Sequence, residues 1–235
     1  MIVTVTQVEH YTDSLFRIRT TRPAHFRFSA GEFVMINLEG TPKRAYSLTS
    51  GPYDDYLEFY SIKVPDGPLT SVLQNITIGD TIEVSERSTG TLILANVTLN
   101  GNLWMMATGT GIAPFISLLR DPEVYERFHK ITVAWTVRVR DELAAYHDFL
   151  KQQPIMYYPT VTQDAPGGGV YRGRITEHID AHGFWADIGP DVDRVMICGN
   201  MDFNKEMKQR LEKLGFNEGN NKQAGTFVQE KAFVG

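Results

Sequence analysis

The stretch LWMMATGTGIAPFISLLR, residues 103–120, decides the fold of the second half of this 235-residue chain. An apolar strand, LWMMA, leads through a glycine-containing turn into the helical pattern FISLLR. Three more strand-loop-helix segments follow, namely KITVAWT to DELAAYHDFLKQ, IMYYPTVT to ITEHIDAHG, and DRVMICGN to MDFNKEMKQRLEKLG. Four such segments predict a parallel sheet flanked by helices, as in nucleotide-binding α/β domains.

The last of these helices, residues 201–215, carries the strongest local signals. Glu206 and Arg210 have the spacing of an i,i+4 ion pair, and Gly215 stands where the helix should stop. One apolar stripe is predicted along it, formed by Phe203, Met207, Leu211 and Leu214. This pattern is typical of a helix that packs one face on a sheet.

The first half of the chain has a different rhythm, with short alternating segments separated by turn residues. The predicted strands are IVTVTQVEHYT, LFRIRTT, EFVMINLEG, RAYSLTS, LEFYSIKV, DTIEVSER and TLIL. They indicate an antiparallel β-barrel of Greek-key type, with one short helix at PLTSVLQN. Turn residues in LANVTLNGN place the boundary, so we expect a barrel domain over 1–97 and an α/β domain over 98–235.

Composition and charge exclude several classes of protein. A formal charge of −5 and a pI near 5.7 give no basic footprint for nucleic acid. The single cysteine, Cys198, cannot form an internal disulfide or build a metal cluster by itself, and it suits a reducing cytoplasm. No apolar run approaches the length of a membrane span, and the start of the chain lacks an export signal. We therefore expect a cytoplasmic protein with no bound metal and no membrane anchor.

The turn ATGTGIAPF, residues 107–115, is a candidate phosphate site. Gly109 and Gly111 let backbone amides approach an anion, and Pro114 suits the first turn of a helix. The segment lacks the full GxGxxG fingerprint of dinucleotide-binding turns. A tight turn with no ligand is the alternative interpretation.

Three other segments carry candidate chemistry. In the strand RAYSLTS, residues 44–50, Arg44 and Tyr46 share one face, which suits a ligand with a phosphate and a flat ring. An exposed strand face with an arginine over a tyrosine explains the pattern equally well. The helix start in YSIKVPDGPLTS is either a second phosphate cradle or only a capped helix. Taken alone, Cys198 in CGNMDF is best interpreted as a small buried side chain.

The order of these four signals resembles the ferredoxin-NADP reductase family along the whole chain. RxYS in a barrel strand is followed by the helix start, by GTGIAP at the opening of the α/β domain, and by CGN on its last strand. The ending VQEKAFVG resembles the tail of the bacterial flavodoxin and ferredoxin reductases within that family. The resemblance implies an FAD-binding barrel and an NADP-binding α/β domain.

The resemblance also assigns roles around the flavin. It implies that Arg44 meets the FAD pyrophosphate, that Tyr46 stacks on the isoalloxazine, and that Ser47 lies near flavin N5. Strict alternation points Ser47 away from Tyr46, so its role requires a strand end or a bulge. The other FAD-binding positions implied are Ala45, Tyr60, Ile62, Lys63, Val64, Pro68, Leu69, Thr70, Thr110, Ala232 and Phe233, the last two in the tail that covers the flavin.

For the nicotinamide nucleotide, the resemblance implies a second set of positions. Cys198 and Glu230 match residues that surround the nicotinamide and flavin during hydride transfer, and with Ser47 they form the expected catalytic group. The NADP-binding positions implied are Gly109, Thr110, Gly111, Arg138, Thr162, Gln163, Arg172, Arg174, Cys198, Gly199, Asn200 and Asp202.

The segment VRVRDE bears on the choice between NADPH and NADH. An NAD-selective site usually has a carboxylate after the strand that corresponds to KITVAWT. Here Arg138 and Arg140 come first after that strand, and they favour a 2′-phosphate. A charged helix start is the alternative interpretation. Gln163 stands where the related reductases have a second arginine, and Arg174 keeps the third. Arg172 can substitute only if DAPGGGVY folds back, so we expect a moderate preference for NADPH.

The activity implied is electron transfer between NADPH and ferredoxin or flavodoxin, by a monomer that docks its carrier transiently. Because such carriers are acidic, a local basic patch is expected, drawn from Lys43, Lys63 and Arg87. One alternative is a flavin reductase that feeds an oxygenase or a small acceptor. A less favoured one is a non-enzymatic electron-transfer subunit, although such subunits usually carry a cysteine cluster for an iron-sulfur centre.

Overall fold

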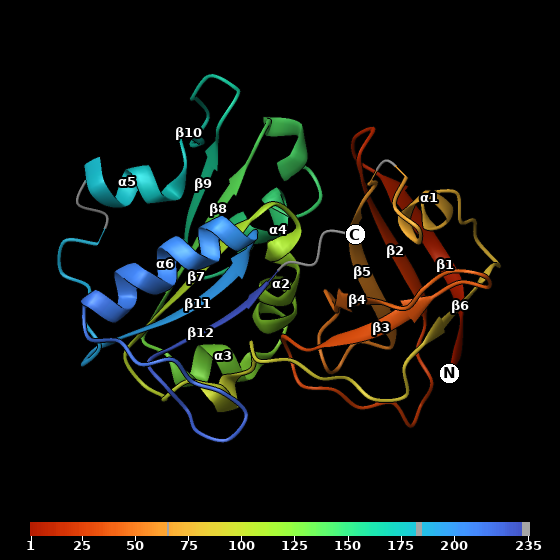
Figure 1. The fold of residues 1–235 in the computed structure, drawn as a ribbon, viewed down its shortest axis with the longest axis horizontal. Helices are drawn as coiled ribbons and strands as arrows, with labels where there is room; N and C mark the ends of the chain where they lie inside the picture. Colours follow the sequence, from red (N-terminus) through yellow and green to blue (C-terminus); the bar gives the residue numbers. More distant parts are fainter. Residues whose placement is uncertain (65, 182–184, 232–235) are drawn as a thin grey trace. The chain divides into compact units, whose positions relative to one another are not determined.

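The computed structural model describes residues 1–64, 66–181 and 185–231, and these form two compact units (Figure 1). Unit 1 contains Met1–Ile93 together with Ala113–Asp121. Unit 2 contains Leu94–Ile112 and the described residues from Pro122 onward. A segment from the middle of the chain therefore belongs with the N-terminal unit.

Unit 1 is built on one antiparallel sheet whose strand order is β4-β3-β6-β1-β2-β5. The strands are β1 (Ile2–His10), β2 (Leu15–Thr21), β3 (Phe33–Asn37), β4 (Arg44–Ser47), β5 (Tyr56–Ile62) and β6 (Thr81–Val84). A bridge between Leu48 and Phe59 and a 2.9 Å bond from Thr49 N to Glu58 O join its two edges. The sheet therefore closes into the predicted antiparallel Greek-key barrel.

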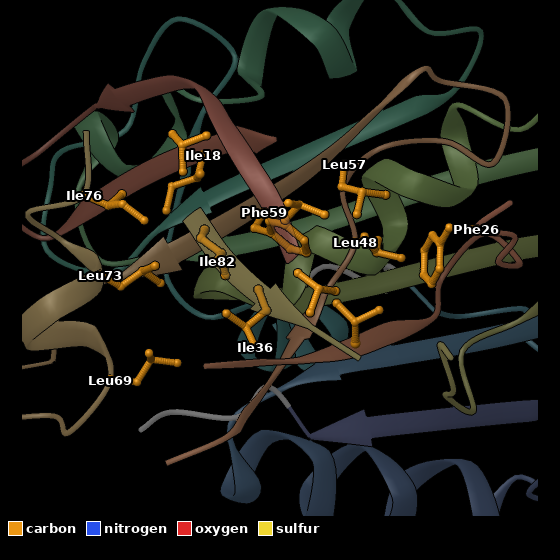
Figure 2. Packing of buried hydrophobic residues seen from close by; sticks show 14 of the residues in the cluster. Ile18, Phe26, Ile36, Leu48, Leu57, Phe59, Leu69, Leu73, Ile76 and Ile82 are labelled. Atoms are coloured by element: carbon orange, nitrogen blue, oxygen red, sulfur yellow. The ribbon is translucent and has the colours of Figure 1, made fainter. Parts of the chain in front are cut away.

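Alternation along the strands fills the barrel with apolar side chains. Figure 2 shows Ile18, Ile36, Leu57 and Phe59 among the residues that pack together. The short helix α1 (Thr70–Leu73) lies where a helix was predicted, and its Leu73 enters the same cluster. The apolar residues of each strand thus face one another, as a period of two requires.

Helix α2 (Ala113–Leu119) belongs to unit 1 and packs against it. Every residue of α2 is buried. The Ser117 hydroxyl donates to Ser50 O at 2.7 Å and accepts from Gly31 N at 3.3 Å. Arg120, one residue beyond the helix, pairs with Glu58 of β5 at 3.2 Å. The helix after the glycine turn is thereby fixed to the barrel.

The prediction of a strand at TLIL, residues 91–94, is wrong. The chain makes a single bridge from Thr89 to Phe33 and then runs without strand pairing into a 3₁₀ turn, η1 (Leu94–Asn96). Leu92 is completely buried, and its carbonyl oxygen lies 1.9 Å from where a Cβ on Gly31 would be. The apolar residues of this segment therefore serve packing, and its backbone meets Gly31 without joining the sheet ladder.

Unit 2 contains the predicted parallel sheet, in the order β10-β9-β8-β7-β11-β12. Its strands are β7 (Asn102–Thr108), β8 (Lys130–Val137), β9 (Met156–Val161), β10 (Tyr171–Arg172), β11 (Asp193–Gly199) and β12 (Phe227–Lys231). The chain proceeds from β7 outward to β10 and then returns to the other side of β7 (Figure 1). Ligands of open α/β sheets bind at such a reversal, at the carboxyl ends of the strands.

The helices of unit 2 include three that were predicted, with two corrections, and one, α3, that was not predicted. They are α3 (Pro122–Arg127), α4 (His147–Gln152), α5 (Ile175–Ala181) and α6 (Met201–Lys213), with 3₁₀ turns η2 (Gly109–Ile112) and η3 (Arg140–Leu143). The single helix predicted over 141–152 is divided into η3 and α4, because Tyr146 between them leaves helical geometry at φ −136° and is buried.

The second correction concerns α6. Phe203, Met207 and Leu211 are buried against the sheet as predicted, and Glu206 pairs with Arg210 at 2.8 Å. Leu214 is 47 % exposed, because the helix ends at Lys213 and Leu214 is its C-cap. Gly215 follows with φ +85°, a conformation that favours glycine at this position. None of the described helices is long and apolar enough to cross a membrane.

Candidate functional site

The register of β4 places Arg44 and Tyr46 on one face, as predicted. Arg44 is opposite Ile36 and Tyr46 is opposite Val34, and paired residues in an antiparallel ladder share a face. Tyr46 meets Phe59 edge-on at 6.5 Å, and its hydroxyl lies 3.3 Å from Ser61 Oγ. Burial raises the pKa of Tyr46, against the opposing effects of Ser61 and the Arg44 charge, so the phenol is neutral.

Arg44 supplies a positive charge beside that ring. Its guanidinium donates to the Lys43 carbonyl at 3.1 Å, and it forms no ion pair with any described residue. A half-exposed guanidinium next to an ordered aromatic ring matches a ligand with a phosphate and a planar ring system. The donor set of unit 1 therefore fits an anionic flavin nucleotide.

Ser47 is the last residue of β4 and pairs with Phe33. The register runs without a bulge from Arg44 to Ser47, so Ser47 lies on the opposite face from Tyr46. A role for Ser47 near the flavin required either a strand end or a bulge, and the structure has the strand end. Its catalytic role stays a prediction.

The predicted helix start is held by Thr70. Its hydroxyl accepts from Val64 N at 3.3 Å and donates to Val64 O at 3.2 Å, which ties α1 to the chain after β5. Leu69 is buried in the barrel core, so only its backbone can face a ligand. Tyr60 is buried on the face of β5 opposite Phe59. Among the other predicted flavin positions, Ala45, Ile62, Lys63 and Val64 are half-buried and Pro68 is exposed. Ala232 and Phe233 lie outside the described residues.

In unit 2 the glycine turn is tightly packed against the end of β11. Gly109 adopts φ +53°, and its carbonyl accepts the Trp135 indole N–H at 2.8 Å. A Cβ on Gly111 would lie 2.2 Å from the Cys198 carbonyl oxygen. Thr110 is half-exposed between these two glycines. The turn therefore presents its backbone at the reversal of the sheet, between the ends of β7 and β11.

Cys198 and Glu230 are neighbours in the pairing of β11 with β12. Burial, and secondly the charge of Glu230, raise the pKa of the Cys198 thiol well above its ordinary value. The neutral thiol is therefore a compact packing group and not a nucleophile. The half-buried Glu230 is held through its backbone, because Asn204 Nδ2 donates to its carbonyl at 2.8 Å.

The loop after β11 brings three more predicted residues to the same edge. A Cβ on Gly199 would lie 2.3 Å from Thr108 Oγ1, the hydroxyl that accepts from Asn200 N at 3.2 Å. The Asn200 side chain caps α6 by accepting from Phe203 N at 2.9 Å. Asp202 is exposed in the first turn of that helix. The side chain of Asn200 thus has a structural partner that the sequence did not reveal.

The charged residues after β8 and β9 lie beside one another. Gln163 N donates to Arg138 O at 2.9 Å, and Thr162 N donates to Val137 O at 3.1 Å. Arg138 is 58 % exposed and pairs with Glu142 at 2.6 Å. Gln163 is exposed and half-buried Thr162 precedes it, so both accompany Arg138 at the carboxyl edge of the sheet.

Arg140 does not belong to this group. Its guanidinium donates to the carbonyls of Gly167 and Ala165, at 2.9 and 3.1 Å. It holds the glycine loop, whose Gly167 and Val170 bond each other. The loop DAPGGGVY folds back, which was the condition for Arg172 to substitute for the missing arginine. Strand β10 pairs with β9 and places Arg172 opposite Val161. Arg172 and Arg174 are exposed, and neither has an ion pair within the described ranges.

Sequence reasoning missed two supports of this edge. His178 Nε2 lies 2.8 Å from Arg172 O, and its Nδ1 lies 2.9 Å from the Tyr158 hydroxyl. The Tyr158 ring stacks on Tyr171 at 4.1 Å. No spacing in the sequence reveals this arrangement. Glu142, in contrast, has i,i+4 spacing from Arg138 and was detectable.

Comparison with known proteins matches both units. Residues 1–92 match the family described as the oxidoreductase FAD-binding domain, and residues 105–209 match the oxidoreductase NAD-binding domain. The flavodoxin/ferredoxin–NADP reductase of Rhodobacter capsulatus is 44% identical, over 99% of this chain and 93% of that protein. The ferredoxin–NADP reductase of Azotobacter vinelandii is 40% identical, over 98% of this chain and 96% of that one.

A solved structure agrees with these relatives. The ferredoxin NADP+ reductase of Neisseria gonorrhoeae, described with bound FAD and NADP, superposes with a TM-score of 0.92. It is 30% identical, and the match covers 99% of this chain and 98% of that one. The likeness therefore extends through both units.

Proposed function

The chain belongs to the ferredoxin/flavodoxin–NADP reductases, and from that premise we propose how its own residues hold FAD and NADPH for electron transfer. It is an FAD-dependent oxidoreductase that transfers electrons between NADPH and ferredoxin or flavodoxin. The observation that carries the assignment of residues is that Arg44, which has no ion pair with any described residue, shares one strand face with Tyr46.

In the flavin site, Arg44 would neutralise the pyrophosphate, Tyr46 would support the isoalloxazine, and Ser47 would contact the ring near N5. Thr70 fixes the turn before α1, so that backbone amides there are held in place. FAD held there would supply the redox chemistry, which is acceptance of a hydride at N5 and release of single electrons. The protein contributes positioning and charge, and the described part of the barrel supplies both.

In the nicotinamide site, the backbone of Gly109 to Gly111 receives the dinucleotide. Cys198 is a neutral contact at the end of β11, and Glu230 beside it supplies a carboxylate near the reacting ring. Gly199, Asn200 and Asp202 continue the same edge. Arg138, Arg172 and Arg174 would bind the 2′-phosphate together with Thr162 and Gln163, which is supported by the backbone bond from Gln163 to Arg138 and by the pairing of β10 with β9. Ala232 and Phe233 are proposed to cover the flavin.

The proposed domain bounds assign FAD to residues 1–97 and NADP to residues 98–235, and they differ from the compact units in that Ala113–Asp121 belongs to unit 1. The lone cysteine supports a reducing compartment such as the cytoplasm, and the net charge of −5 argues against a nucleic-acid partner. We propose a monomer that meets ferredoxin or flavodoxin transiently through a patch containing Lys43, Lys63 and Arg87.

One experiment tests this function as a whole. The purified protein, saturated with FAD, is titrated stepwise with NADPH while its absorption spectrum is recorded, and turnover is then followed with ferredoxin and with flavodoxin. Bleaching of the flavin and turnover with at least one carrier are expected. A flavin that stays oxidised, or failure with both carriers, would overturn the proposed assignment.

Replacing Tyr46 with alanine is expected to weaken FAD binding by about 1 kcal/mol or more, because a stacked aromatic contact is lost. Tyr46→Phe keeps the ring and loses only the hydroxyl near Ser61, so it should bind FAD much as the parent does. Tyr53→Ala, at an 80% exposed tyrosine of the same unit, is the matched control. Flavin fluorescence measures the dissociation constant, and unchanged binding by the alanine variant at position 46 would contradict the stacking role.

Donor selectivity should respond to charge at the sheet edge. Arg174→Ala is expected to lower the ratio of kcat/KM for NADPH to that for NADH by about tenfold or more, since a charge-assisted contact is worth about 1.5–3 kcal/mol. Gln163→Arg should raise the ratio by a similar factor. Gln209→Arg adds the same charge to the exposed side of α6 and should leave the ratio unchanged. If neither Arg174→Ala nor Gln163→Arg changes this ratio, the 2′-phosphate binds elsewhere.

A further inference from the structure

Glu142 holds Arg138 by three hydrogen bonds, each to a different nitrogen. Its Oε2 accepts the backbone N–H of Arg138 at 2.9 Å. Its Oε1 accepts the side-chain Nε–H at 2.9 Å and an Nη2–H at 2.6 Å. One carboxylate thus fixes both the start and the end of the arginine side chain.

The two partners differ sharply in burial. The Glu142 side chain is 8% exposed, whereas that of Arg138 is 58% exposed. Glu142 lies in η3 next to the buried Leu143, which anchors this turn in unit 2. The carboxylate is therefore the fixed member of the pair, and the arginine is the member that reaches solvent. Holding a long side chain in one rotamer in advance saves the entropy that binding would otherwise cost.

The geometry leaves the useful edge of the guanidinium open. Glu142 occupies the edge formed by Nε and Nη2. One hydrogen of Nη1 and the second hydrogen of Nη2 form the far edge, between the two terminal nitrogens. Nη1 makes no hydrogen bond within the part of the chain that the structure describes. That far edge is a planar fork of the kind that binds two oxygens of one phosphate.

We propose that Glu142 is a positioning residue for donor selectivity, because it orients the open edge of Arg138 toward the 2′-phosphate that distinguishes NADPH from NADH. The inference rests on the proposed function, which places Arg138 at that phosphate. Glu142 itself touches neither the phosphate nor the reacting atoms. Its effect is confined to the donor that carries the 2′-phosphate.

A double-mutant cycle on the FAD-loaded protein tests this role. The ratio of kcat/KM for NADPH to that for NADH is measured for the parent, Arg138→Ala, Glu142→Ala and the double variant. Arg138→Ala should lower the ratio by about ten- to a hundredfold, and Glu142→Ala by about three- to tenfold, with kcat/KM for NADH nearly constant. In the Arg138→Ala background, the Glu142 change should alter the ratio by less than about twofold, because the two residues act as one unit.

Glu123→Ala is the matched control, because Glu123 and Arg127 form an i,i+4 pair in α3 of the same unit. It should leave the ratio unchanged. Equal losses with NADPH and NADH in Glu142→Ala would show a merely structural role and overturn the inference. A raised ratio would overturn it too, since Glu142 would then be competing with the phosphate for Arg138. An unchanged ratio in Arg138→Ala would instead overturn the proposed placement of that arginine, whatever Glu142 does.

Discussion

Replacing Glu58 with alanine is expected to destabilise the protein by about 3–5 kcal/mol, the usual cost of removing one partner from a buried ion pair. The Glu58 side chain is fully buried in unit 1. Arg19 Nε lies 2.6 Å from it, Arg120 Nη2 lies 3.2 Å away, and Arg17 Nε lies 3.7 Å away. Thr49 donates a further bond at 2.9 Å. Removal of the carboxylate would leave three guanidinium groups around an uncompensated site.

The midpoint of urea unfolding at saturating FAD measures the effect. Glu9→Ala is the matched control, because Glu9 pairs with the same Arg17 at a side chain that is 37% exposed. An exposed pair contributes at most about 1 kcal/mol, so this variant should stay close to the parent. Equal losses in the two variants would show that burial of Glu58 does not determine its contribution.

The same carboxylate predicts a dependence on pH. Burial alone would raise the pKa of Glu58, but Arg120, Arg17 and Arg19 outweigh it and hold the pKa below its ordinary value of 4.5. A group whose pKa is lower in the folded state stabilises the fold above its unfolded pKa and loses that contribution as the pH falls. We therefore expect the parent to lose more unfolding free energy than Glu58→Gln as the pH falls below about 4.5. Parallel curves for the two proteins would contradict this.

Substituting Gly111 with alanine is expected to slow flavin reduction by NADPH about a hundredfold. The new Cβ would lie 2.2 Å from the Cys198 carbonyl oxygen and 2.7 Å from its carbon, so the turn or the end of β11 must move. A misplacement of about 1 Å at a reacting site can cost about a hundredfold in rate. Overpacking of this kind also destabilises by about 1–3 kcal/mol.

Single-turnover reduction, followed at the flavin absorption band, measures this effect directly. Gly189→Ala is the matched control, because a Cβ there would meet nothing within 4 Å. It should reduce its flavin within about twofold of the parent rate, since no contact has to move. Reduction of the Gly111 variant at the parent rate would show that the end of β11 does not position the nicotinamide.

Both sheets were predictable from the sequence, because alternation in the first half and strand-loop-helix rhythm in the second are local signals. The predictions failed where contacts with residues distant in the sequence determine the local structure. The apolar run at 91–94 is as hydrophobic as a strand, yet the backbone of Leu92 lies close to Gly31 and does not pair in the sheet. Tyr46 and Arg44 were correctly placed on one face because strand alternation depends only on sequence position. The contacts of Arg140 could not be predicted, because its partners are backbone carbonyls of a loop that lies far along the chain.

Within the described residues, unit 1 is made of two pieces of chain, and this restricts how this protein can be recombined with its relatives. A chimera that joins residues 1–97 of this chain to the remainder of a relative would separate Glu58 from Arg120. The carboxylate at position 58 and the guanidinium at position 120 must therefore be inherited together. A crossover placed after Asp121 keeps the pair intact and transfers the glycine turn along with the barrel. The segment that must be exchanged as one piece therefore extends to Asp121, beyond the last strand of the barrel.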